Sequence, residues 1–150
     1  MDRMPATRSA PRNGCDHQLE EFLAAFRDGT LPREVWTHEA HLIVAWATLR
    51  ELGDAEATCA LLIEQIRAYN RCDTTAATPV DCHQTLTRYY VLAIDALQPS
   101  TLSDVLLART CSRQAPQRHW SPRVLASTEA RAGWVEPDRA PLPWVDGSAR

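Results

Sequence analysis

The stretch Trp36-Thr37-His38-Glu39-Ala40-His41-Leu42 begins the most apolar helix that the sequence predicts. Thr37 is a favoured N-cap residue and Gly53 a favoured stop, so we expect this helix to span about residues 38–52. His38 and His41 are three residues apart and therefore share one helical face. The rest of that face is apolar: Ala45, Leu49 and Leu52. We therefore expect both imidazoles to point into the protein at one end of the helix.

Helical periodicity recurs along the chain, and no segment alternates as a strand does. Asp16 and Asp54 predict caps for helices of about residues 16–28 and 54–70. Asp81-Cys82-His83-Gln84 has the form of a capping box for a helix that ends near Leu97. Its apolar face would carry His83, Leu86, Tyr90, Ala93 and Leu97.

The C-terminal third predicts shorter elements. A Thr101–Asp104 capping box begins a helix of about residues 102–109, residues 111–121 form a loop, and Pro122 starts one last helix that frays by Gly133. The proline-rich stretch 134–143 should lie extended across the bundle, held by Trp134, Leu142 and Trp144. The expected fold class is all-α, an up-down four-helix core with short C-terminal helices and an extended tail.

Length and composition favour one soluble domain. The chain has 150 residues; we expect residues 1–14 to form a disordered tail and 15–150 a single helical domain. A net charge of -3 argues against nucleic acid as a partner, and no apolar run is long enough for a membrane helix. All 16 basic residues are Arg, which indicates a GC-rich bacterial genome. Five cysteines without a CxxC pair favour a reducing cytoplasm, and the composition permits a homo-oligomer.

Helix direction brings a third histidine to the first two. Short connections make successive helices antiparallel, so the helices that begin near His38 and His83 run parallel and start at the same end of the bundle. The C-terminal end of the helix between them arrives there too, with Arg67, Tyr69 and Asn70. The sequence therefore predicts one pocket that contains His38, His41 and His83.

Three hypotheses compete for this pocket. In the first, the three histidines bind a divalent transition metal (Zn, Fe, Mn or Cu) in a metal-dependent enzyme that acts on a small molecule. A helix N-terminus lowers an imidazole pKa and keeps the ring able to ligate, although the same dipole repels a cation. In the second, the helix N-termini and Arg67 bind a small, anionic ligand, with the histidines as hydrogen-bonding or acid–base groups. In the third, the histidines only cap helices and bind each other or backbone carbonyls.

We also assign roles to other polar residues that are expected at the end of the bundle with the three histidines. Gln84, Arg67 and Arg131 are candidate catalytic residues, and Asn70, Tyr69 and Thr87 are candidate substrate-binding residues. Thr87 follows His83 by one helical turn and could orient its ring. Arg131 has two open interpretations, a salt bridge to Asp138 or a clamp for a substrate carboxylate.

Four segments in this order resemble a family of small bacterial proteins of unknown function. They are the segment from Leu31 to Leu42, Ile66-Arg67-Ala68-Tyr69-Asn70, Cys82-His83-Gln84-Thr85-Leu86-Thr87, and the stretch from Ala130 to Pro143. The resemblance covers about residues 19–144 and implies no particular reaction. In that family the third segment reads Tyr-His-Glu-Thr. Gln84 replaces the Glu and cannot take up a proton, although it can cap a helix or coordinate weakly.

Overall fold

Every regular element of the described chain is a helix. The computed structural model describes residues 14–72 and 82–146. Its α-helices are α1 (Gly14–Asp28), α2 (His38–Leu52), α3 (Ala55–Arg71), α4 (Gln84–Leu97), α5 (Leu102–Leu107), α6 (Pro122–Leu125), α7 (Thr128–Ala132) and α8 (Pro143–Asp146). Three short 3-10 helices are interspersed, namely η1 (Arg33–Val35), η2 (Arg109–Cys111) and η3 (Ala115–Arg118). The predicted all-α fold class is confirmed.

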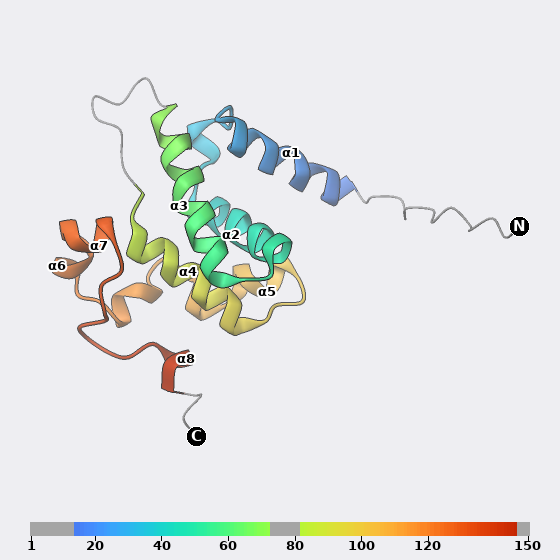
Figure 1. Ribbon diagram of the computed structural model, residues 1–150. Helices are drawn as coiled ribbons and strands as arrows, with labels where there is room; N and C mark the ends of the chain where they lie inside the picture. Colours follow the sequence, from blue (N-terminus) through green and yellow to red (C-terminus); the bar gives the residue numbers. More distant parts are fainter. Residues whose placement is uncertain (1–13, 73–81, 147–150) are drawn as a thin grey trace, which may run out of the picture.

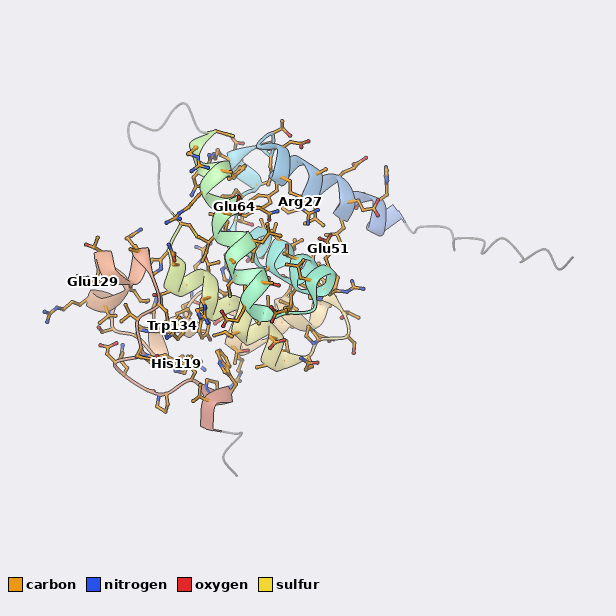
Figure 2. The ribbon with its side chains drawn as sticks, in the orientation of Figure 1. Arg27, Glu51, Glu64, His119, Glu129 and Trp134 are labelled. Atoms are coloured by element: carbon orange, nitrogen blue, oxygen red, sulfur yellow. The ribbon has the colours of Figure 1, made fainter. Side chains whose placement is uncertain are left out.

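Helix α2 lies at the centre of the bundle. It packs against α3, α4 and α5, and α3 also packs against α4 and α1 (Figure 1). Only Gly53 and Asp54 separate α2 from α3, which makes the two helices antiparallel. Arg27 of α1 donates a hydrogen bond of 3.1 Å to Glu51 of α2 and ties the first helix to the central one (Figure 2). No helix of the described residues is long and apolar enough to cross a membrane.

The ends of α2 are formed as the sequence predicts. The Thr37 hydroxyl accepts a hydrogen bond from the backbone N–H of Ala40, and Gly53 ends the helix in the left-handed region with φ 67°. Asp54 caps α3 in the same way, through the N–H of Ala57. The first turn of α2 is therefore fixed locally, and His38 and His41 project from it.

The cap of α4 differs from the prediction. His83 is its N-cap residue, with extended backbone, and its Nδ1 accepts from the Leu86 N–H at 3.2 Å. The predicted capping box would need Asp81 as the N-cap residue and Gln84 three positions later. Gln84 is instead the first helical residue, so this prediction is wrong. Asp81 lies outside the described residues. A neutral imidazole has one acceptor nitrogen, which can accept the hydrogen bond from a backbone N–H of the first turn as a Ser, Thr, Asp or Asn oxygen usually does.

Three other predicted boundaries also change. Helix α1 begins at Gly14, so Asp16 lies inside it, and Gly14 does not belong to the predicted tail; residues 1–13 lie outside the described residues. Helix α5 ends at Leu107, where Ala108 adopts extended backbone before η2. The single predicted helix after Pro122 is two helices, because Ser127 is extended and caps α7.

Two residues of the predicted apolar stripes lie outside the core. Leu52 and Leu97 are 43% and 39% exposed, because each ends a helix beyond the packed region. The central stretch of α2 is instead buried all round, since neighbours surround it: Val44, Ala45, Trp46, Ala47 and Thr48.

The C-terminal segment is held against α4 by buried polar atoms. The hydroxyl of Thr85, fully buried in α4, donates to the Gly133 carbonyl at 2.6 Å and accepts from the Val135 N–H. The Trp120 indole donates to the Val135 carbonyl, and its ring contacts the ring of Trp134 edge-on. Figure 2 shows Trp134 and His119 in this part of the molecule, which Figure 1 places on the far side of α4 from α1. The predicted docking of the tail is confirmed for residues 134–142, whereas Pro143, predicted to be extended, begins α8.

The dual role of His83 predicts a specific order of stabilities. His83→Ala removes the cap of α4 and should lower the free energy of unfolding by about 2 kcal/mol, whereas His83→Asn should lower it by about 1 kcal/mol less because Asn keeps a cap acceptor. Urea unfolding followed by circular dichroism measures both. Equal losses in the two variants would contradict the capping role.

Candidate functional site

One cavity of about 650 Å³ opens at the end of the bundle where α2 and α4 begin. This volume lies in the range of about 300–1,000 Å³ that is typical of small-molecule sites. Much of its wall is apolar and comes from several elements: Val44, Ala45, Leu62, Ile66, Leu86, Leu125. His38, His41 and His83 all line it, and we call it the histidine cavity.

His38 joins the start of α2 to the 3-10 segment that follows α5. Its Nε2 lies 2.9 Å from the backbone carbonyl of Cys111, and its ring meets the Tyr90 ring edge-on at 5.1 Å. A carbonyl oxygen only accepts, so Nε2 carries the proton and Nδ1 keeps a lone pair. Nδ1 makes no hydrogen bond to any described residue.

His41 has the opposite tautomer. Its Nδ1 donates to the carbonyl of Thr37 at 2.7 Å, one turn earlier in the chain. The lone pair is therefore on Nε2, which has no hydrogen-bond partner in the described part of the chain. The Trp36 ring lies against the imidazole, with centroids 3.9 Å apart, and fixes the plane of the ring.

His83 uses both ring nitrogens. Its Nε2 donates to the Leu125 carbonyl at 2.7 Å, while Nδ1 caps α4. The ring thus links α4 to α6, and its tautomer is fixed from both sides. Thr87 donates to the backbone carbonyl of His83 and contacts the Cys82 thiol, so it supports the His83 backbone and does not touch the ring.

The surroundings keep two of these rings neutral. Burial is the main cause that lowers the pKa of His41, and the neighbouring His38 lowers it further. Burial also lowers the pKa of His83, with a smaller contribution from the Arg131 guanidinium. The lowered pKa values agree with the direction expected from a helix N-terminus, but desolvation is the larger cause.

Three arginines give the histidine cavity a positive lining. Arg33 in η1, Arg113 in the connection between η2 and η3, and Arg131 in α7 line it, and none of its described lining residues is acidic. Arg33 is held in place, since its guanidinium donates to the Tyr69 carbonyl at 2.8 Å and lies over the Tyr69 ring. The guanidinium groups of Arg113 and Arg131 make no hydrogen bond or ion pair with a described residue.

The other predicted site residues divide into two groups. Asn70, Thr87 and Arg131 line the histidine cavity, whereas Arg67, Tyr69 and Gln84 do not.

Tyr69 belongs to the core. It is 1% exposed, and its hydroxyl donates to the Leu31 carbonyl at 2.7 Å. Its phase on α3 points the side chain at Phe26 and Trp36, which form an aromatic cluster with it.

The expected Arg131–Asp138 ion pair is absent from the described residues. The Asp138 carboxylate instead accepts from the backbone N–H of Ser121 at 2.8 Å, and this bond lowers the pKa of Asp138. Asp138 therefore helps to hold the start of α6, and Arg131 is directed to the histidine cavity.

The three histidines do not form a ready metal site. Among the described residues, no group of three or more His, Cys, Asp or Glu side chains is arranged to hold a metal ion. His38 and His41 each keep one lone pair, but His83 would have to give up the α4 cap or the Leu125 bond to ligate. The metal site stays a prediction.

Sequence reasoning missed two of the arginines that line the cavity. Arg33 follows Pro32 in a connection without periodicity, where it binds the carbonyl end of α3. Arg113 lies between η2 and η3, in a stretch predicted only as loop. Neither position belongs to a helical face, so no pattern in the sequence assigns it to the histidine cavity.

The chain matches no protein-family model, no curated protein and no solved structure. The resemblance of its four segments to a small bacterial family therefore stays a prediction.

The lowered imidazole pKa values predict acid sensitivity. As the pH falls below the ordinary histidine pKa of 6.5, the unfolded chain binds protons before folded His41 and His83 do, so the free energy of unfolding should fall. Urea unfolding at several pH values between about 7 and 5 should show a weaker decline for the double variant His41→Phe, His83→Asn. Gln117→Leu, which changes a cavity residue without an ionisable group, is the control. An unchanged pH profile in the double variant would refute this origin of the acid sensitivity.

Proposed function

We propose that the histidine cavity binds a small molecule with an apolar body and an anionic group, either a carboxylate or a phosphate. The observation that carries this proposal is the lining, which combines an apolar wall with three arginines and no described acidic side chain. A cavity of this kind excludes water from the ligand body and places positive charge where an anion would sit.

Arg113 and Arg131 are the best candidates for the anion contact. Both are exposed although they line the cavity, so they lie where it meets solvent. A guanidinium pairs with two oxygens of a carboxylate or phosphate at once, which fixes the orientation of the ligand. Neither group would have to break an ion pair with a described residue in order to bind.

A ligand screen tests the proposal. Thermal-shift and calorimetric titrations with phenylacetate, hexanoate and phenyl phosphate should give at least one ligand that stabilises the protein. Arg113→Gln and Arg131→Gln should each weaken its binding by about tenfold or more, since each removes one charge-assisted contact.

Arg123→Gln supplies the matched control, because it removes the same charge from an exposed position on α6 that does not line the cavity. Its affinity should equal that of the wild type. No binding by any of the three ligands, or equal losses in Arg123→Gln, would refute the anion site.

A metal-dependent enzyme is the second candidate, supported by the lone pairs of His38 Nδ1 and His41 Nε2 at the same cavity. A divalent transition metal bound there would need further ligands from substrate or water. Elemental analysis of untagged protein should then show near-stoichiometric metal that the double variant His38→Ala, His41→Ala loses. Metal-free protein with full ligand binding would refute it.

We propose a bacterial, cytoplasmic setting for this binding. The described cysteines Cys59, Cys72, Cys82 and Cys111 form no disulfide, and three of them are buried. Reduced cysteines in such numbers support a reducing compartment.

A further inference from the structure

We infer that His41, assisted by His38, recognises a hydroxyl group on the anionic ligand, so that the histidine cavity selects hydroxylated carboxylates or phosphates over their deoxy analogues. This inference rests on the proposed function and narrows its class of ligand. It assigns a specificity role to two histidines that each keep one ring nitrogen without a partner among the described residues.

The hydrogen bonds of the three rings separate His83 from the other two. His83 has a partner on each nitrogen, so its role is complete within the fold. His38 and His41 each donate to one backbone carbonyl and keep one acceptor nitrogen that no described residue uses. No described residue donates to these two nitrogens, so a ligand hydroxyl can bind to them without displacing a hydrogen bond of the protein.

His41 is held ready to accept. The bond of 2.7 Å to the Thr37 carbonyl fixes its tautomer, and the Trp36 ring fixes its plane. Both contacts come from the chain just before His41 or from the first turn of its own helix, so they do not depend on the ligand. A ring oriented beforehand loses little entropy when a hydroxyl binds to it.

The polar oxygens of the cavity wall cannot easily replace these nitrogens. The Thr37 hydroxyl already accepts from Ala40, the Asn70 side-chain oxygen accepts from Arg33, and the Thr87 hydroxyl is engaged with His83 and Cys82. The acceptors open to a ligand are therefore the two imidazoles and the amide oxygen of the exposed Gln117 side chain, and of these the imidazoles are the ones whose rings are held by hydrogen bonds to the backbone. The positive charge of the cavity determines which ligand group can donate a hydrogen bond to these nitrogens. The arginines would repel an ammonium group but not a neutral hydroxyl.

A matched pair of ligands tests the inference. Mandelate and phenylacetate share a ring and a carboxylate and differ by one hydroxyl. Calorimetry at pH 7.5 should show that mandelate binds the wild type about five- to tenfold more tightly, the value of one hydrogen bond. His41→Phe should bring the ratio of the two affinities close to one, while the matched variant His83→Asn should keep the ratio of the wild type.

The outcomes distinguish this inference from the proposed function. Equal binding of the two ligands, with the dependence on Arg113 and Arg131 intact, would overturn the role of His41 and leave the anion site standing. Binding of neither ligand would overturn both. Metal bound in stoichiometric amounts and lost with His38 and His41 would also overturn the inference, because the acceptor nitrogens would then be metal ligands.

A spectroscopic test needs no variant and begins with the ligand-free protein. Nitrogen-15 NMR of the imidazole rings at pH 7.5 should show His41 as the Nδ1–H tautomer and His38 as the Nε2–H tautomer. Addition of mandelate should shift the unprotonated nitrogen of His41 most. The Nε2–H tautomer at His41 would overturn the inference even if mandelate binds.

Discussion

The burial of α2 on nearly all sides is the constraint on which the site depends. Because α3, α4 and α5 surround the middle of this helix, its first turn begins at the edge of the core, where Ala40 is buried and His38 and His41 are half-buried. Half-buried polar groups at such an edge are satisfied partly by the protein and partly by what fills the space beside them. His38 and His41 each bind a backbone carbonyl with one ring nitrogen, keep the other without a partner among the described residues, and line the histidine cavity. The packing of the core thus determines the chemistry at its end.

Local patterns were enough to predict where the histidines lie. The caps Thr37 and Asp54 depend on a few neighbouring residues, and so do the phase of α2 and its short connection to α3. Given these, topology alone brings His83 to the cavity that His38 and His41 line. The partners of His38 and His83 could not be predicted, since Cys111 and Leu125 lie 73 and 42 residues away in irregular or short elements.

The predictions that were wrong share one physical origin. Where the local sequence allows more than one structure, contacts with distant parts of the chain decide which one forms. Asp81 is a better cap residue by propensity, yet His83 caps α4 because its other nitrogen is fixed by Leu125. Tyr69 arrives at the correct end of the bundle, but its phase on α3 turns it into the aromatic cluster around Phe26. Arg113 reaches the cavity from a segment whose path is set by packing, so periodicity carries no information about it.

The electrostatics of the cavity connect the arginines to the histidines. Positive charge and burial act in the same direction on an imidazole, since both disfavour its protonated form. The arginines also oppose a cation at the free nitrogens, while they attract an anion. When an anion binds beside the arginines, it cancels part of their field and favours protonation of the nearby imidazoles. At His83, whose pKa the Arg131 guanidinium lowers, an anion bound to Arg131 would therefore raise the pKa, and binding of the anion would be coupled to protonation of this ring.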